Sequence, residues 1–211
     1  MTLEDVQVRC LAFASQATAA DAAHDLSHIK RVLKNTIYLT DIEGVNSWVT
    51  LPAACLHDCV PVAKDSTLRA QGSRLAAEAA TAFLASIDFP GELLSDVSHA
   101  IEAHSYSAGI EPRTAEARVV QDADRLDSLG AIGIARCLLV GGRLDRPLCA
   151  IDDPFCDERE PDDGKYTIDH FYAKLLKLPA TMQTEAGRTE AERRAVLMRR
   201  YLDDLRAEIE L

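Results

Sequence analysis

The chain has 211 residues, of which 47% are hydrophobic, and this is enough for a sizeable core in one domain or one domain with an appendage. Its 23 basic and 34 acidic side chains give a formal net charge of −11, which argues against binding long nucleic acid, because such binding needs a basic surface. A small phosphorylated ligand is not excluded, since one metal ion and a few basic residues can neutralise its charge.

The sequence also argues against a membrane protein and against a disulfide-linked one. No apolar stretch reaches the roughly 20 residues that span a bilayer, and residues 1–5 lack the pattern of a secretory signal. We therefore expect a cytoplasmic protein with no membrane partner. The six cysteines, at positions 10, 55, 59, 137, 149 and 156, form no Cys-x-x-Cys pair and are expected to be free, buried thiols.

Abundant alanine, sparse glycine and proline, and the near absence of strand-type alternation predict an all-α fold. We expect helices over about 3–20, 25–43, 46–59, 67–86, 90–104, 114–140 and 167–178, and a long last helix after the possible capping box Thr189-x-x-Glu192. Gly44 is expected to end the second helix. Gly130 and Gly133 lie inside the sixth helix, where they predict the close approach of a neighbouring helix.

The predicted organisation is a single helical domain over residues 1–211. Its core covers about 20–140, residues 141–165 form a long lid-like loop with an acidic cluster, and residues 166–211 form C-terminal helices. In the last helix Ala191, Ala195, Met198, Leu202, Leu205 and Ile209 recur at helical spacing. This stripe is compatible with packing on the core and with packing on a partner, so a homo-oligomer is one of the expectations.

Polar side chains that packing does not explain form three clusters. In the first, His24, His28 and Arg31 share one face if the second helix begins early enough; the alternative is a solvated basic face. In the second, His57-Asp58 ends an apolar run, although such a dipeptide also occurs by chance.

The third cluster lies in the sixth predicted helix, which is apolar around much of its circumference. Asp124 and Asp127 are three residues apart and share a face, whereas Asp122 points roughly the opposite way. Acids embedded in such a helix need partners. The alternative to a functional site is structural pairing with Arg118, Arg125 or Arg136.

Together the clusters supply two histidines and two carboxylates, a mixed nitrogen and oxygen donor set. Such a set suits Mn²⁺, Fe²⁺, Co²⁺ or Ni²⁺ and tolerates Zn²⁺ or Mg²⁺. We expect one divalent ion, with Mn²⁺ or another transition metal favoured.

The order of these motifs resembles the HD-domain superfamily of metal-dependent phosphohydrolases. His28 with Arg31-Val32 is similar to its H-x-x-R-V motif, His57-Asp58 to its eponymous pair, and residues 123–127 to its A-D-x-x-D segment. Further matching segments include 104–107, 130–136 and 170–176, so the likeness runs from about 20 to 210, and it is close to a bacterial branch with nucleotide pyrophosphohydrolases.

The resemblance implies an irregular helical bundle with a metal site of His28, His57, Asp58 and Asp124. Candidates to accept a proton are Asp127, His104 and His24, and candidates to hold phosphate are Arg31, Lys64 and His104. Binuclear relatives commonly carry an adjacent His-His, which is absent here. His99 is expected to be a surface or packing histidine, and His170 a structural one.

Three functions compete. The first is a phosphohydrolase acting on a nucleotide or another small phosphorylated substrate, in its sharper version splitting a nucleoside triphosphate into monophosphate and pyrophosphate. The second is a metal- and nucleotide-binding sensor without turnover. The third, a helical scaffold with no site, is disfavoured by the number and order of matched segments. The four ligands and the neighbouring Asp127 favour the enzyme, because a sensor need not keep a proton acceptor.

Overall fold

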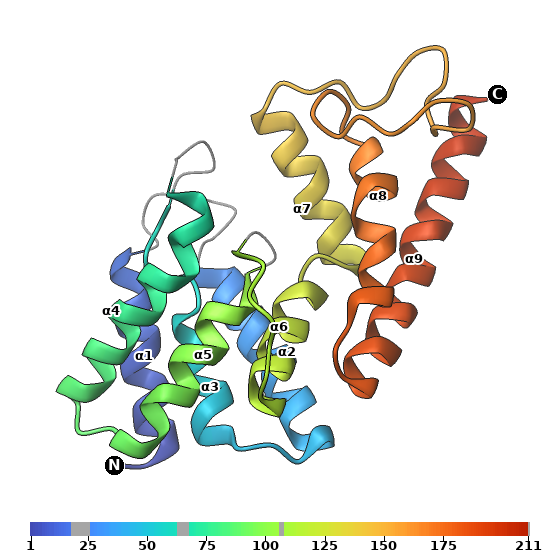
Figure 1. Cartoon of the computed structure of the whole chain (residues 1–211). Helices are drawn as coiled ribbons and strands as arrows, with labels where there is room; N and C mark the ends of the chain where they lie inside the picture. The colour runs from blue at the N-terminus through green and yellow to red at the C-terminus, as the bar shows by residue number, and fades with distance from the viewer. Residues whose placement is uncertain (18–25, 63–67, 106–107, 211) are drawn as a thin grey trace. The chain divides into compact units, whose positions relative to one another are not determined.

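The computed structural model describes residues 1–17, 26–62, 68–105 and 108–210, and every regular element among them is a helix (Figure 1). The predicted all-α fold is thereby confirmed. The described chain divides into two compact units, residues 1–124 and 125–211, with the boundary near the end of one helix. The single domain over residues 1–211 stays a prediction, and each unit is described by itself.

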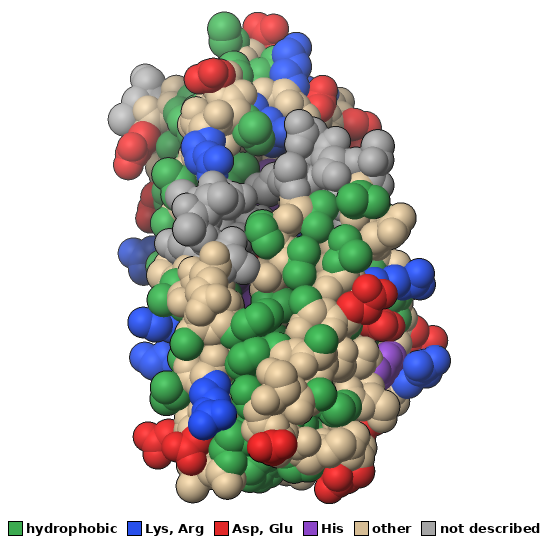
Figure 2. All heavy atoms as spheres, turned by 90° about the vertical axis from the view of Figure 1, so that its left-hand side faces the viewer, with side chains coloured by type: hydrophobic (Ala, Val, Ile, Leu, Met, Phe, Trp, Pro, Cys, Tyr) green, Lys and Arg blue, Asp and Glu red, His purple; other side chains and the backbone are tan. Residues whose placement is uncertain are grey.

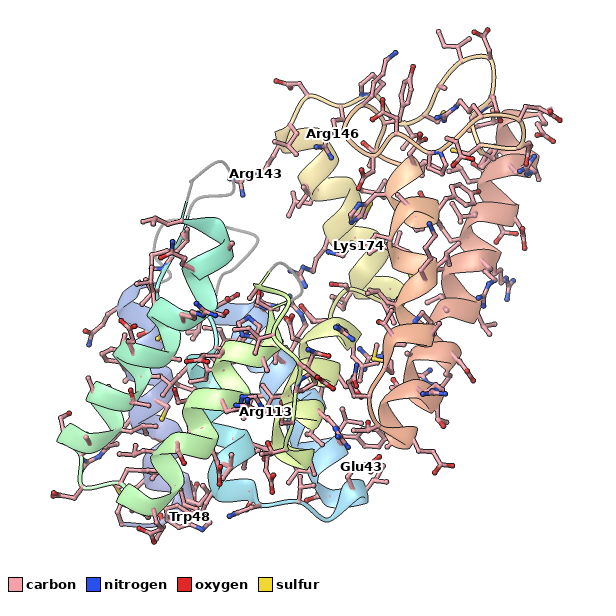
Figure 3. All side chains as sticks on the ribbon, in the orientation of Figure 1. Glu43, Trp48, Arg113, Arg143, Arg146 and Lys174 are labelled. Atoms are coloured by element: carbon pink, nitrogen blue, oxygen red, sulfur yellow. The ribbon has the colours of Figure 1, made fainter. Side chains whose placement is uncertain are left out.

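The first unit is built around one short, largely apolar helix. α3 (Ser47–Leu56) contacts α1 (Leu3–Ala17), α2 (Leu26–Glu43), α4 (Gly72–Ser86) and α5 (Leu94–His104). Every residue of α3 from Val49 to Leu56 is buried, as expected for a largely apolar helix, and the hydroxyl of Thr50 is paired with that of Thr40 at 2.9 Å. Asn46 caps its start by accepting the Trp48 N–H, and the Trp48 ring lies 6.1 Å from that of Phe89 (Figure 3).

The predicted third helix ran through residue 59, and its end is wrong. α3 ends at Leu56, His57 is its C-cap, and Asp58 lies in the following turn. The Cys59 N–H bonds to the Leu56 carbonyl at 3.1 Å, which tightens the chain into a turn. Pro61 then disfavours helical geometry at the preceding residue.

Glycine explains two other helix boundaries. Gly44 follows α2 with φ of +65°, and its N–H bonds to the Thr40 carbonyl at 3.0 Å, which confirms the predicted C-terminus. The single helix predicted over 114–140 is wrong, because it is two helices, α6 (Ala115–Leu126) and α7 (Gly130–Arg143). Gly130, with φ of +68°, begins the second one. A Cβ at Gly133 would lie 2.2 Å from the Ser128 carbonyl oxygen, so the close approach predicted for it comes from this turn rather than from a neighbouring helix.

Short 3₁₀ segments precede two helices, η1 (Arg69–Gln71) before α4 and η2 (Gly91–Leu93) before α5.

In the second unit the helix predicted over 167–178 is also wrong: α8 (Asp169–Ala173) stops at Lys174 and η4 (Leu175–Thr181) follows. Lys174 has φ of −135° and ψ of −58°, outside helical geometry, and this interrupts the helix.

The last helix, α9 (Glu185–Ile209), packs on α7 and η4. Its N-cap is Thr184, whose Oγ1 accepts the Gly187 N–H at 3.0 Å, so the capping box predicted at Thr189 is wrong and Thr189 lies inside the helix. The predicted apolar stripe is buried at four of its six positions: Ala191, Ala195, Met198 and Leu202.

The segment predicted as a lid-like loop is irregular beyond the end of α7 and is tied down by hydrogen bonds. Asp153 accepts the backbone N–H groups of residues 157, 158 and 159 at 2.9–3.0 Å. The guanidinium of Arg159 donates two hydrogen bonds to Asp169, whose side chain is fully buried. A lid function for this segment stays a prediction.

The described surface carries charges of both signs (Figure 2). On the face in Figure 2, the described Lys and Arg side chains are interspersed with Asp and Glu rather than gathered into one basic stripe. Within the described part of the chain, no helix combines the length and apolarity needed to cross a membrane. All six cysteines are free; four are buried, and Cys149 and Cys156 are half-buried.

Candidate metal centre

Three segments of the first unit bring the predicted ligands together. His28 lies in the first turn of α2, His57 and Asp58 follow the last residue of α3, and Asp124 lies in the last turn of α6. The turn after α3 matters for the pair, because adjacent residues of one helix point about 100° apart. Because the helix ends at Leu56, the side chains of His57 and Asp58 can approach the same point.

The donor atoms of these residues converge. His28 Nε2 and His57 Nε2 lie 3.2 Å apart, and Asp58 Oδ2 lies 3.8 Å from the first and 3.5 Å from the second. Asp124 Oδ1 lies 3.4 Å from His28 Nε2 and 3.9 Å from His57 Nε2. Neighbouring ligands of an octahedral ion with bonds of about 2.1 Å are separated by about 3.0 Å, so the four side chains need only a small contraction to share one ion.

The protonation of His57 suits a ligand. Its Nδ1 donates to the Ala54 carbonyl oxygen at 2.8 Å, which leaves the lone pair on Nε2 and directs it at the other donors. Complete burial lowers the pKa of His57, and this outweighs the opposing influence of Asp58. His57 is therefore neutral at pH 7. Without an ion, His28 Nε2–H can donate to this lone pair; with one, both lone pairs converge on it.

The site has a buried side and an accessible side. The side chains of His28 and His57 are 2% and 0% exposed, whereas those of Asp58 and Asp124 are 29% and 28% exposed. The nitrogen donors thus lie on the buried side of the site, and the carboxylates lie on the side that water and a ligand can reach.

Two amide side chains, which the sequence reasoning missed, support this geometry. Asn35 lies two helical turns after His28 on the same face of α2, and its Nδ2 donates to the Ala123 carbonyl at 3.0 Å, directly before Asp124. Gln121 Nε2 donates to the Ala103 carbonyl at 2.6 Å, directly before His104. The seven-residue spacing of His28 and Asn35 was the one available signal, and a polar residue on a helix face does not reveal its partner.

His104, at the end of α5, is the fifth polar side chain at the site. Its Nδ1 donates to the Ile101 carbonyl at 2.6 Å, and its Nε2 lies 3.6 Å from Asp58 Oδ1, the carboxylate oxygen that is not directed at His28 and His57. Burial favours the neutral form of His104. The charges of Asp58 and Asp124 and the Ile101 carbonyl outweigh burial, so its pKa is raised above that of an ordinary histidine.

The remaining acids of α6 and its following turn differ in environment. Asp127 is buried, and its Oδ2 accepts a hydrogen bond from Arg136 at 2.6 Å, which is one of the structural pairings the sequence left open. Asp122 is also fully buried. Arg31 extends from α2 one turn after His28 and donates to Ser27 Oγ at 2.8 Å.

Two of the predicted site residues, His24 and Lys64, lie outside the described residues. The two other histidines have structural partners. His99 Nε2 accepts the backbone N–H of Arg113 at 2.9 Å (Figure 3), and burial together with Arg113 lowers the pKa of His99. His170 Nδ1 lies 2.8 Å from Asp163 Oδ2, within the second unit.

The chemistry of the donor set fits a divalent cation. Two carboxylates beside two imidazoles place about two negative charges on one small volume, and a dication neutralises them. The most compact group, His28, His57 and Asp58, has its ligand atoms within 4.8 Å of one another. Two imidazole nitrogens with two carboxylates are typical of divalent transition-metal sites, and HD domains bind divalent metals.

Known proteins resemble this chain in sequence and fold. A family model described as "HD domain" matches residues 25–129. The uncharacterized protein YpgQ of Bacillus subtilis is 30% identical over 196 residues, which cover 91% of this chain and 87% of that protein.

Solved structures extend the likeness to three dimensions. The crystal structure of B. subtilis YpgQ in complex with ADP is 28% identical, with a TM-score of 0.78 over 99% of this chain and 97% of that one. That of an HD-superfamily hydrolase from Bacillus thuringiensis is 32% identical, with a TM-score of 0.77 over 98% of both chains. With the convergent His28, His57, Asp58 and Asp124 and this likeness along its whole length, the chain belongs to the HD-domain family.

Proposed function

We propose that the protein is a metal-dependent phosphohydrolase that acts on a nucleotide. The observation that carries the proposal is the convergence of two buried imidazoles and two partly exposed carboxylates on one point. Support for a nucleotide comes from the relative B. subtilis YpgQ, whose crystal structure is described as a complex with ADP. The sharper version of the proposal is cleavage of a nucleoside triphosphate into monophosphate and pyrophosphate.

In this proposal His28, His57, Asp58 and Asp124 hold one divalent ion, with Mn²⁺ or another transition metal favoured. When bound, such an ion lowers the pKa of a water molecule and polarises a phosphorus–oxygen bond. The Ala54 carbonyl keeps His57 in the tautomer that presents Nε2. The exposed edges of Asp58 and Asp124 leave room for a phosphate and for water.

Other side chains handle the substrate and the proton. His104 Nε2, 3.6 Å from Asp58 Oδ1, is placed to donate a hydrogen bond to a phosphate oxygen or to exchange a proton with water. Arg31 is a candidate for holding phosphate charge because it lies one turn from His28 on α2. His24 and Lys64 keep the same candidate roles. Asp127 remains a candidate proton acceptor, although Arg136 engages one of its oxygens.

The test is turnover of a nucleotide panel. The purified protein is incubated with nucleoside mono-, di- and triphosphates in Mn²⁺, Co²⁺ or Mg²⁺, and phosphate and pyrophosphate are assayed separately. We expect product from the wild type and none from Asp58→Ala, with circular dichroism showing that the variant folds. Tight binding of Mn²⁺ and nucleotide without product would favour the sensor. A wild type that retains no divalent ion would refute both.

The role of His104 needs a different pair of variants. His104→Gln keeps a polar side chain but cannot exchange a proton, so we expect kcat to fall by about 10²-fold or more while Mn²⁺ affinity stays within a few fold. His99→Gln is the matched control on the same helix, because His99 contacts the Arg113 backbone instead of the site. Equal effects of the two substitutions on kcat would contradict the assignment.

A further inference from the structure

The helix end that carries Asp124 is unusual in how its carbonyl groups are satisfied. The last four carbonyls of an α-helix have no partner within the helix. In α6 these belong to residues 123–126, so Asp124 lies inside the turn that is most prone to fray. Asn35 supplies a partner for the Ala123 carbonyl, and the Ser128 N–H bonds to the Arg125 carbonyl at 3.0 Å.

Two arginines from later helices donate to carbonyl groups at the helix end and directly after it. Arg194 of α9 donates from Nη1 to the Leu126 carbonyl at 2.7 Å, which also accepts the Leu129 N–H at 3.1 Å. Arg136 of α7 donates from Nη1 to the Asp127 carbonyl at 3.1 Å and to Asp127 Oδ2 at 2.6 Å. The positive charge of a guanidinium group at this position also interacts favourably with the helix dipole, whose C-terminal end is negative.

The turn after α6 is shaped around these contacts. Gly130 has φ of +68°, and a Cβ there would lie 3.3 Å from Cβ and Cγ of Arg194. The Arg194 stem therefore lies directly over the glycine while its head reaches Leu126. Arg125 adds a further anchor by donating to the Thr181 carbonyl at 2.5 Å. Asp127 has an exposed fraction of 1%, so its carboxylate is enclosed within this group.

We propose that Asp127, Arg136 and Arg194 are positioning residues, which cap the end of α6 and thereby hold Asp124 in the orientation needed to bind the metal ion. The inference rests on the proposed function, in which Asp124 is a ligand. The cap acts through the continuous backbone of α6, since Leu126 is two residues and Asp127 three residues beyond Asp124. In this proposal Asp127 acts as the acceptor that orients Arg136, as an alternative to the proton-acceptor role considered above.

The test measures metal affinity and leaves activity aside. Mn²⁺ binding to Arg136→Met and Arg194→Met is followed by calorimetry or by the loss of the free-ion paramagnetic resonance signal. We expect the Kd to rise about tenfold or more in each variant, as is typical when the partners that orient metal ligands are removed. Arg136→Lys keeps the charge and loses the planar guanidinium geometry, so we expect a smaller rise in the Kd for Mn²⁺. This variant replaces Arg136→Met in the test if Arg136→Met does not fold.

A matched control separates this role from general stability. Arg159 and Asp169 form an ion pair of the same type in the second unit, with exposed fractions of 26% and 0%, against 24% and 2% for Arg136 and Asp127. Arg159→Met removes a comparable pair far along the chain from Asp124. We expect its Mn²⁺ affinity to stay within twofold of the wild type even where its melting temperature falls as much as that of Arg136→Met.

A double-mutant cycle tests the role of Asp127. If Asp127 acts by orienting Arg136, then Asp127→Asn also weakens Mn²⁺ binding, and adding Arg136→Met has little further effect. Asp127→Asn with wild-type Mn²⁺ affinity and a large loss of kcat would overturn the proposal in favour of proton transfer. Unchanged affinity in both arginine variants would overturn the cap while leaving the metal site intact. A wild type that binds no Mn²⁺ would overturn the proposed function, and the cap with it.

Discussion

Replacing Glu190 with Gln should lower stability at neutral pH and have almost no effect in strong acid. On α9, the Glu190 carboxylate accepts hydrogen bonds from Arg193 at 2.7 and 2.8 Å and from Arg194 Nε at 2.7 Å. The hydrogen bond from Arg193, followed by that from Arg194, lowers the pKa of Glu190 from 4.5 to about 2 against the opposing influence of burial. Glu190 thus orients the arginine that caps α6.

The magnitude and sign follow from the pKa. The folded value lies below the unfolded one, so the ionised carboxylate stabilises the folded state above about pH 4.5, and this contribution is lost as the pH falls toward 2. The full difference corresponds to at most ~3 kcal/mol. Because Arg193 is 73% exposed and solvent screens its charge, we expect Glu190→Gln to reduce the free energy of unfolding by about 1–2 kcal/mol at pH 7.

Urea unfolding followed by circular dichroism at pH 7, 4 and 2.5 measures this difference. The gap between wild type and Glu190→Gln should shrink steadily across the series. Glu192→Gln, at an exposed position of the same helix, is the control and should change the free energy by less than about 0.5 kcal/mol. A gap that stays constant from pH 7 to 2.5 would refute the electrostatic reasoning, because uncharged packing would then explain it.

Three further predictions concern the site and its supporting turn. Asp124→Asn should abolish Mn²⁺ binding. Asp122→Asn should leave the Mn²⁺ affinity largely intact and instead lower the melting temperature, because Asp122 is fully buried. Calorimetry on both variants checks this, and the reverse result would contradict the assignment of Asp124 as the ligand. Saturating Mn²⁺ should raise the melting temperature of the wild type but not of Asp58→Ala, with about 2.7 kcal/mol of added stability at 100 times the Kd, and a scan with and without chelator measures it. Gly133→Ala should lower the free energy of unfolding by about 1–3 kcal/mol, because the new Cβ would overlap the Ser128 carbonyl oxygen. Gly142→Ala is the control and should be neutral or slightly stabilising, because a Cβ there would meet nothing within 4 Å. Equal melting temperatures of the two variants would contradict this.

The helical class and the membership of the site could be read from the sequence because both depend on local pattern. Apolar spacing of 3.6 residues predicted α2 and most of α9, and a continuous apolar run indicated the buried α3. Gly44 marked a helix end through its own backbone preference. Charged or imidazole side chains in apolar helices marked the three clusters, and the resemblance to the HD-domain superfamily implied that His28, His57, Asp58 and Asp124 are the ligands. Their convergence in space agrees with that prediction.

The tertiary structure decided what pattern alone leaves open. The break at residues 127–129 and the end of α3 before His57 depend on turns closed by backbone hydrogen bonds, which helical periodicity does not register. Asn35 bonds to a residue 88 positions away, Arg136 to one 9 positions away, and Arg194 to one 68 positions away. A polar side chain on a helix face does not by itself reveal such a partner. The sequence by itself determined which side chains are available to bind a metal ion. Folding decided which of them meet, because local turns end the helices that carry them, and hydrogen bonds between segments far apart in the sequence hold those helix ends in place.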